Sequence, residues 1–351
     1  MCVWSAYTGK KQAAPEVLEA GTAIEGIWGG FYTGIVTMDD QGLHCAKCCG
    51  WSKYWKQRFR TEDLPGTTGL FHSRTNSGGN GEWAHPFVGT AGKVAHVGQG
   101  SDGVFSDMAP WAELANELAA KGKIFRTADR NIPLKRYPEL ADGNKVHVAE
   151  VTANAVEALF EAGSEPLEAI RRVFERVHEE SIGLYIFAGH PGKIFFVNMN
   201  QRGAVWFTPE GAYAATSLLA FGLPVVKATE IPLNSVGFFT AESFYSESLP
   251  DPGYPIYDKI PDGCLSKALA YLAGNPDSTL ARITDKGFGP LFPASGIKLR
   301  AVTAHRIAET LCGEHRAERR STEVDGPCGT RGLQTLFRAA AIPDKKDAAG
   351  A

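Results

Sequence analysis

The chain has 351 residues, of which 44% are hydrophobic and 21% are charged, values typical of globular proteins and unlike those of disordered or coiled-coil chains. Its 36 basic and 39 acidic residues give a formal net charge of −3, so no overall basic excess indicates binding to nucleic acid or to an anionic membrane. No apolar run approaches the roughly 20 residues of a membrane helix, and the first residues lack the basic and apolar regions of an export signal. We therefore expect a cytoplasmic protein with one large or two moderate domains.

Seven cysteines lie scattered along the chain. An odd number of cysteines without an export signal argues against a disulfide framework, so we predict reduced thiols. Cys45, Cys48 and Cys49 have the spacing of half a zinc site, but no second Cys or His pair with suitable spacing follows. The glycines form no phosphate-binding pattern either. We therefore predict ordinary strand residues at these cysteines, and neither a metal nor an organic cofactor.

Apolar runs and turn residues predict the first elements. β-rich runs at Gly34–Met38 and Leu43–Cys48 flank a polar turn that contains a glycine, which predicts a hairpin. The glycine-rich region Thr67–Gly103 predicts loops laid over short strands, where functional sites usually lie.

Two amphipathic helices are predicted next, with a break at Gly163. Their apolar residues recur at helical spacing, at Val148, Val151, Ala155 and Leu159 and again at Leu167, Ile170, Phe174 and Val177. Three apolar β-type runs follow, at Gly183–Phe187, Lys193–Val197 and Ala204–Phe207. Strands, a helix pair and then strands predict stacked helix and sheet layers.

A proline-rich segment, Ser248–Pro255, is predicted to link two domains, residues 1–247 and 262–351. The charge changes sign here, because residues 1–261 hold 23 basic and 29 acidic side chains and the remainder holds 13 and 10. The second part predicts three short helices, a hairpin at Arg316–Gly329 and a last helix at Leu333–Ala341. This order fits a small winged-helix-like domain or a plain, mainly helical accessory domain.

Several basic residues of the second part are candidates for a basic face, at Lys298, Arg300, Arg306, Arg316, Arg319 and Arg320. Five acidic residues lie between positions 309 and 325, however. The interspersed signs predict a mixed, solvated surface, with a nucleic-acid contact left as the alternative.

Cys2 is the first candidate for chemistry. A small residue after the initiator methionine normally allows removal of that methionine, which leaves a thiol and a free α-amine on one residue. An α-amine titrates near pH ~8, so it can act as the general base for its own thiol. A cysteine at position two can also be accidental, without a catalytic role. The motifs that follow favour the catalytic interpretation.

Four segments follow Cys2 in a characteristic order, at Trp28–Gly34, Gly69–Gly79, Ala84–Phe87 and Val94–Gly100. Together with Cys2 they resemble the glutaminase domain of class II glutamine amidotransferases, which are N-terminal-nucleophile hydrolases. The resemblance extends over about Cys2 to Thr240. It implies an α+β fold with four αββα layers, and hydrolysis of an amide through a thioester on Cys2.

The resemblance also implies roles for individual residues. Arg74 matches the family arginine that binds the substrate α-carboxylate, and a planar guanidinium is a suitable partner for that group. Ser77 matches a family threonine on the same loop. His85 matches the family histidine of the Ala-His-Pro stretch.

The predicted oxyanion hole departs from the family. The family uses an asparagine side chain and the adjacent glycine amide, and strict spacing puts Val97 and Gly98 at these positions. Because valine has no side-chain donor, either Gln99 with Gly100 takes over through a two-residue bulge or one donor is lost. Loss of one donor costs about 2.7–4 kcal/mol of transition-state stabilisation.

Further departures affect the substrate. The family aspartate that binds the α-amino group falls in His147–Val151, where Glu150 is the candidate replacement. The family arginine before the Gly-Tyr-Asp stretch is Trp28 here, and the family's loop tryptophan is Thr75. Free L-glutamine is the leading substrate, and an amide that lacks a free α-amine is the alternative.

We therefore predict an amidohydrolase of the class II amidotransferase type. About 110 residues follow the glutaminase-like part, fewer than a synthase domain needs, so we expect ammonia to pass to a separate synthase subunit or the reaction to be plain hydrolysis. The alternative is a catalytically weakened binding or regulatory module. Such a module would keep the fold and contact nucleic acid or protein through its C-terminal domain.

Overall fold

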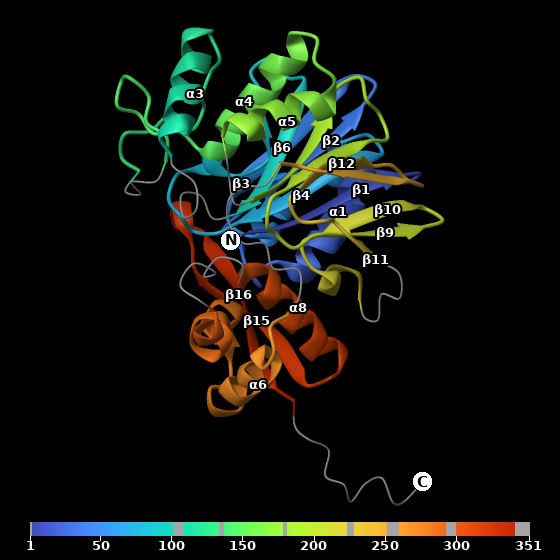
Figure 1. Cartoon of the computed structure of the whole chain (residues 1–351), viewed down its shortest axis with the longest axis vertical. Helices are drawn as coiled ribbons and strands as arrows, with labels where there is room; N and C mark the ends of the chain where they lie inside the picture. The colour runs from blue at the N-terminus through green and yellow to red at the C-terminus, as the bar shows by residue number, and fades with distance from the viewer. Residues whose placement is uncertain are drawn as a thin grey trace, which may run out of the picture.

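The computed structural model describes residues 2–100, 108–132, 137–177, 181–222, 228–250, 260–292 and 300–340. Two antiparallel sheets lie face to face at its centre (Figure 1). The first sheet consists of β1 (Val3–Gly9), β2 (Tyr32–Asp39), β3 (Gly42–Cys49), β4 (Thr68–Arg74), β9 (Ala204–Thr208), β10 (Gly211–Ala215) and β11 (Ala228–Glu230). The second sheet consists of β5 (Phe87–Val88), β6 (Val94–Gly100), β7 (Ser181–Phe187), β8 (Ile194–Asn198), β12 (Ser235–Phe239) and β13 (Phe244–Ser248). The strand orders are β11-β9-β10-β1-β4-β2-β3 and β13-β12-β8-β7-β6-β5.

Helices cover the outer faces of both sheets (Figure 1). The first sheet carries α1 (Ala13–Ile24) and α2 (Ser52–Arg58), and the second carries α3 (Ala109–Ala120), α4 (Val148–Glu161) and α5 (Pro166–Arg176). The apolar side chains between the sheets include Trp4, Leu70, Val97, Leu184 and Phe196. The order of layers is therefore helix, sheet, sheet, helix, as the family resemblance implies.

The close approach of α1 to the first sheet depends on a glycine. A Cβ built on Gly21 would lie 2.1 Å from Cδ1 of Phe71 in β4, so no larger residue fits without displacement. The predicted hairpin is confirmed as β2–β3, and the predicted helix pair as α4 and α5. The three predicted strands that follow are confirmed as β7, β8 and β9.

The glycine-rich region Thr67–Gly103 differs from its prediction. It contains β4 and β6, two central strands of seven residues each, in place of loops over short strands. The glycines in these strands allow close packing, since a Cβ on Gly69 would lie 2.9 Å from the Ala13 side chain and one on Gly98 would lie 2.9 Å from the His96 ring. Glycine here marks a crowded strand interior rather than a turn.

The C-terminal part forms a three-stranded sheet with helices beside it. Its elements are α6 (Cys264–Gly274), β14 (Ser278–Thr279), α7 (Leu280–Arg282), a π-helical turn (Ile283–Phe288), α8 (Arg300–Gly313), β15 (Ala317–Asp325) and β16 (Arg331–Ala339), and the strand order is β14-β16-β15. Short 3₁₀ helices elsewhere span Thr61–Asp63, Gly81–Trp83, Leu218–Phe221, Gly289–Leu291 and Pro327–Gly329. The three predicted helices are present. Residues 251–259 of the predicted linker lie outside the described residues.

The predicted last helix at Leu333–Ala341 is wrong. This segment is β16, which pairs along its whole length with β15, so the predicted hairpin extends beyond Gly329. Leu333, Thr335 and Phe337 are buried while Gln334, Leu336 and Arg338 are more exposed, which is the period of a strand. Pairing with β15 outweighs the weak helical pattern.

The two predicted domains share one apolar cluster. Residues from the first part of the chain, among them Val3, Ile27 and Leu219, pack in the same cluster as Ile307 of α8 and Phe337 of β16. Figure 1 shows α6, α8, β15 and β16 gathered directly below the two sheets. The C-terminal part is therefore packed into the molecule.

A disulfide joins Cys49 to Cys328, with 6.2 Å between their Cα atoms. The prediction that all cysteines are reduced is therefore wrong for this pair, which 279 residues of chain separate. Sequence spacing could not indicate it, because β3 and the β15–β16 hairpin meet only in the folded chain. Within the described ranges, no cluster of three His, Cys, Asp or Glu side chains could hold a metal ion. None of the described helices is long and apolar enough to cross a bilayer.

The mixed surface predicted for the C-terminal part is confirmed at three arginines. Arg306, Arg316 and Arg320 each form an ion pair with a carboxylate, at 2.5, 2.9 and 2.9 Å. Arg319 donates to the main-chain carbonyl of Ala23 at 2.9 Å. The remaining two predicted basic side chains, at positions 298 and 300, lie outside the description.

Candidate active site

The predicted nucleophile and the predicted carboxylate-binding arginine lie together. Val3 of β1 pairs with Ser73 of β4, which puts Cys2 across from Arg74 at the next position of the two strands. Opposing residues of antiparallel strands project from the same face. Cys2 is 9% exposed, and its Sγ lies 4.0 Å from Oγ1 of Thr75. The sequence prediction that these two residues share a site is consistent with this geometry.

Arg74 is 1% exposed and is held by neutral groups. Its Nη1 donates to the Gly78 carbonyl at 2.9 Å, and its Nη2 donates to Oγ of Ser77 at 2.8 Å and to the Tyr137 hydroxyl at 3.1 Å. The guanidinium carbon also lies 4.8 Å from the centre of the Tyr32 ring. None of the described carboxylates forms an ion pair with it. A buried cation is costly unless an anion compensates it, so this site favours an anionic ligand.

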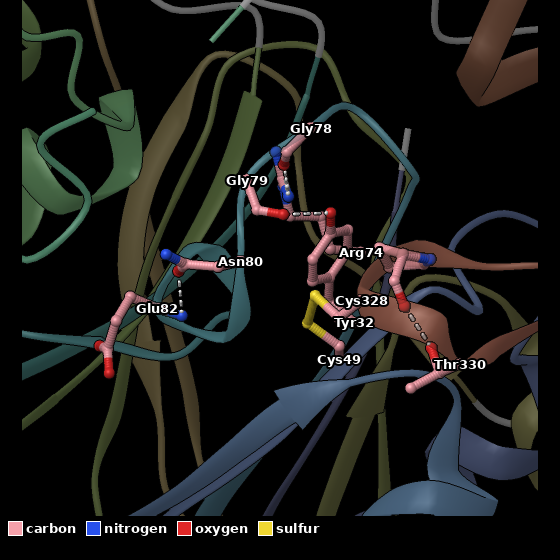
Figure 2. The surroundings of a disulfide bond; sticks show 10 residues. Tyr32, Cys49, Arg74, Gly78, Gly79, Asn80, Glu82, Cys328 and Thr330 are labelled. Carbon is pink, nitrogen blue, oxygen red and sulfur yellow. Dashed lines mark hydrogen bonds between the residues drawn. A yellow bond between two sulfur atoms is a disulfide. The ribbon is translucent and has the colours of Figure 1, made fainter. Parts of the chain in front are cut away.

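The Cys49–Cys328 disulfide lies beside this arginine, as Figure 2 shows. Cys49 is the partner of Tyr32 across the β2–β3 pair, and Tyr32 is in turn the partner of Arg74 across β2–β4. The Tyr32 hydroxyl donates to the Gly79 carbonyl at 3.0 Å, and burial raises the pKa of this phenol. Arg74 and Tyr32 together hold the turn at residues 78–79, one strand away from the sulfur bridge.

Buried histidines lie behind the arginine. The His85 ring stacks on His72 with 4.0 Å between centres, and its Nδ1 accepts from the Gly98 amide at 3.2 Å. His72 Nε2 donates to the Gly98 carbonyl at 2.9 Å. Burial lowers the pKa of His72 to about 3 and that of His85 well below its usual range. His85 is therefore a neutral group that fixes β6, which gives the predicted substrate-side histidine a structural role.

The oxyanion prediction is corrected in two respects. Strands β6 and β7 pair residue for residue from Val94 to Gly100, so the predicted two-residue bulge is absent. The Gly98 amide is already bound to His85, and Gly100 is paired within the sheet opposite Ser181. The Gly98 amide therefore does not offer the free turn donor that the family motif supplies.

The Gln99 side chain carries a hydrogen-bond donor unused among the described residues. It is fully buried, and its Oε1 accepts from Oγ1 of Thr216 at 2.8 Å. Thr216 Oγ1 also accepts from the Trp4 amide at 2.9 Å, which ties the Gln99 side chain to the start of β1. The Gln99 Nε2 has no hydrogen-bond partner within the described part of the chain. One buried donor therefore lies near the nucleophile with its capacity unused.

Glu150, the predicted replacement for the family aspartate, makes its hydrogen bonds within the protein. It lies in the first turn of α4, is 3% exposed and accepts from the Arg126 amide at 2.8 Å. It also accepts from the amide and the hydroxyl of Thr127, at 3.0 and 2.5 Å. Its carboxylate therefore holds the loop at Arg126–Thr127, and these contacts favour a structural role over the predicted one.

Three residues of the site escaped the sequence prediction. His72 alternates with Arg74 along β4, so the period of two in this strand is a signal that could have found it. Tyr32 and Tyr137 reach Arg74 from other segments, and Tyr137 lies 63 residues further along the chain. No local pattern indicates the Tyr137 contact, because it depends on how the loop before α4 folds back.

Comparison with known proteins agrees with the family resemblance. No family model matches the chain. The chain is 29% identical over 196 residues to the glutamine–fructose-6-phosphate aminotransferase (isomerizing) of Gluconobacter oxydans, covering 55% of the chain and 28% of that enzyme. It is 24% identical over 278 residues to the enzyme of the same name from Pyrobaculum aerophilum, covering 77% and 41%. The chain thus spans less than half the length of these curated relatives.

Two solved structures have a similar fold. One is the glutamine phosphoribosylpyrophosphate amidotransferase of B. subtilis, with a TM-score of 0.55, 14% identity and coverage of 91% of this chain and 66% of that one. The other, described as the allosteric regulatory enzyme of purine biosynthesis, has a TM-score of 0.56, 16% identity and coverage of 79% and 59%. The resemblance to class II glutamine amidotransferases is therefore confirmed, through named sequence relatives and through the fold.

Proposed function

We propose that this protein is an amidohydrolase of the class II glutamine amidotransferase type, which releases ammonia from glutamine through a thioester on Cys2. The observation that carries the proposal is the buried Arg74 guanidinium, which lies on the same sheet face as Cys2 without a carboxylate partner in the described structure. The α-carboxylate of glutamine is an anion of suitable geometry for it. Its side-chain amide then extends toward Cys2.

The chemistry needs only groups of the chain and water. The Cys2 sulfur attacks the side-chain amide carbon, its proton passes to the α-amine, and the tetrahedral intermediate expels ammonia as the amine returns the proton. Water then attacks the thioester, which gives glutamate and restores the thiol. The net reaction is glutamine and water to glutamate and ammonia. This route requires removal of Met1, because the α-amine must belong to Cys2.

We propose Gln99 Nε2 as an oxyanion donor. It is a buried amide donor without a partner among the described residues, and Thr216 fixes the other end of the same amide group. Such a pre-oriented donor is the group that stabilises developing negative charge most effectively. Gln99 then replaces the asparagine of the family without the bulge that spacing suggested.

The C-terminal domain, residues 262–351, is proposed to be a small, winged-helix-like accessory domain beside a glutaminase-like domain at residues 1–247. The support is its order of elements, α6, β14, α7, α8, β15 and β16, with the sheet order β14-β16-β15. We propose that the ammonia passes to a separate synthase subunit or is the released product.

The alternative, a weakened module that binds nucleic acid, receives little support. In a winged-helix domain the third helix reads the groove of DNA. The residues of that helix here, Val302–Glu309, are buried except for Arg306, which is partly exposed and paired with Glu230. A helix packed into the molecule in this way has no free face for a groove.

The proposal is tested with purified full-length protein. Release of ammonia and glutamate from glutamine is measured for the natural chain and for Cys2→Ala, with Cys45→Ala, which removes an exposed thiol, as the matched control. We expect Cys2→Ala to abolish turnover and Cys45→Ala to leave it unchanged. The intact mass of the active protein must correspond to the chain without Met1. Turnover by the Cys2→Ala variant, or no covalent adduct on the Cys2 sulfur after treatment of a Met1-free sample with a glutamine-like electrophile, contradicts the proposal.

A further inference from the structure

A pocket of about 360 Å³ lies on the outer face of the first sheet, between α1, β9, β10 and the 3₁₀ helix Leu218–Phe221. Helix α1 lines it with Glu16, Glu19, Ala20 and Ala23, whose spacing places them on one face of the helix. A concave site of this size, lined by apolar and aromatic side chains with a few polar groups, is the usual form of a small-molecule site. The residues proposed for glutamine hydrolysis are not among its described lining residues.

Three aromatic rings line the sheet side of this pocket. Trp206 of β9 and Tyr213 of β10 are directly paired across the two strands, so both side chains project from the same face of the sheet. Their ring centres lie 6.0 Å apart, and the Phe221 ring lies 5.5 Å from Trp206 and 6.3 Å from Tyr213. All three side chains are partly exposed. Because the faces of aromatic rings carry partial negative charge, a wall of three rings favours a cation.

The α1 side of the pocket is acidic. Glu16 and Glu19 are the charged side chains among the described lining residues. Oε2 of Glu16 accepts from the Tyr213 hydroxyl, and its Oε1 lies 3.5 Å from Nζ of Lys11. Burial, followed by the hydrogen bond to Glu16 and the charge of that carboxylate, raises the pKa of the Tyr213 phenol, which therefore stays neutral and keeps donating. The pocket thus combines negative charge with aromatic rings, and both oxygens of Glu16 already have partners.

Two basic side chains lie near this pocket but are not among its described lining residues. Arg319 donates to the main-chain carbonyls of Ala23 and Leu219, at 2.9 and 3.4 Å, so its guanidinium is engaged by the backbone. The Lys11 side chain is 47% exposed, and an exposed ion pair such as Lys11–Glu16 is weak. A cation bound in the pocket can therefore compete with Lys11 for the charge of Glu16.

We propose that this pocket binds a small organic cation of the quaternary ammonium class, whose methyl groups contact the rings of Trp206, Tyr213 and Phe221. The carboxylates of Glu16 and Glu19 compensate its charge. A primary ammonium is strongly hydrated and carries three N–H donors that need acceptors, whereas a quaternary ammonium has no N–H group. Rings beside a carboxylate whose oxygens already have partners therefore suit the methylated cation better.

The pocket is remote from the proposed nucleophile. Tyr213 pairs with Tyr7, which follows Cys2 by five residues, a spacing of about 17 Å along an extended chain. Binding of the cation is measured without turnover. Its outcome therefore does not depend on whether the protein hydrolyses glutamine.

Isothermal titration calorimetry of the full-length protein tests the proposal, with choline as the probe. Choline should bind about tenfold or more tightly than 3,3-dimethyl-1-butanol, its neutral carbon analogue, and than ethanolamine, a primary ammonium. Trp206→Leu keeps an apolar side chain but removes a ring, and should raise Kd about three- to thirtyfold. Glu16→Gln keeps an acceptor for Tyr213 but removes the charge, and should raise Kd about three- to tenfold. Lys11→Gln removes the competing cation and should lower Kd about two- to fivefold.

Tyr245→Leu and Glu242→Gln are the matched controls, since both are exposed and lie at the β12–β13 end of the other sheet. They should leave Kd unchanged. Thermal unfolding identifies any variant that fails to fold, and Lys11→Gln tests the site by a gain of affinity at an exposed position. No binding of choline, equal binding of the neutral analogue, or equal changes in the control variants overturns the proposal. Binding of adenosine, a neutral aromatic probe, in preference to choline indicates a stacking site and overturns it as well.

Discussion

Acid should destabilise this protein through its buried histidines. His72, His96 and His305 are buried, mainly neutral groups whose pKa burial lowers to about 3. In the unfolded chain each returns to about 6.5, so below pH 6.5 the unfolded state binds more protons than the folded state. Stability from these groups is therefore complete above pH 6.5 and is lost as the pH falls toward 3.

The size of the effect follows from the same values. Between pH 7.5 and 5.5 each of the three histidines costs about 1.4 kcal/mol, or about 4 kcal/mol in total. His85 and His147, whose pKa values burial also lowers well below the ordinary value, act in the same direction. Glu25 acts in the opposite direction, because burial raises its pKa. Since whole-domain stabilities are about 5–15 kcal/mol, the loss is a large fraction of the total.

Urea unfolding at pH 7.5, 6.5 and 5.5, followed by circular dichroism, measures this loss. The variant His96→Phe keeps a ring over Tyr185, which lies 4.5 Å from the His96 ring, and removes one titrating group. Its pH-dependent loss should be smaller by about 1.4 kcal/mol, whereas His315→Asn, at an exposed position, should leave the loss unchanged. A free energy of unfolding that changes by less than about 1 kcal/mol between pH 7.5 and 5.5 refutes the reasoning.

Three other changes test the site and the packing. Arg74→Lys should raise KM for glutamine about ten- to a hundredfold, because a lysine ammonium cannot donate two parallel hydrogen bonds to a carboxylate as a guanidinium does. An unchanged KM contradicts the proposal that Arg74 binds the substrate carboxylate. Cys328→Ser removes a disulfide whose cysteines lie 279 residues apart, so the free energy of unfolding in urea should fall by up to about 5 kcal/mol. The natural protein in reductant should lose the same amount. Equal stability of the natural protein with and without reductant argues against the bond. Gly21→Ala should cost about 1–3 kcal/mol by overlap with Phe71, whereas Gly274→Ala, where a Cβ meets nothing within 4 Å, is the control.

Local patterns were sufficient for most elements. The hairpin β2–β3 and the helices α4 and α5 follow from apolar residues repeating at period two or near 3.6, because such patterns bury one face whatever the rest of the chain does. They were misleading at β16, where Leu333–Ala341 fits a helix and a strand equally well until β15 supplies a partner. They also failed at β4 and β6, where glycines that permit close packing resemble turn residues.

In the site as well, local motifs predicted some residues and tertiary contacts supplied the others. Cys2 and Arg74 could be chosen from the sequence, because the family motif and the chemistry of thiol and guanidinium are local properties. The residues that surround them could not. Tyr137, Tyr32 and the buried imidazoles reach the site only after the strands pair and the loops close over them.

Apolar periodicity in the sequence by itself predicted stacked helix and sheet layers, because such a pattern does not depend on distant contacts. The family resemblance added the αββα order and the candidates Cys2 and Arg74, since motif residues are local too. Only the tertiary structure decided that Glu150 supports a loop, that Cys49 is bonded to Cys328 and that α8 brings His305 to Trp28. These contacts join residues between 23 and 279 positions apart. A contact across such separations is set by the packing of the whole chain, which no short pattern encodes.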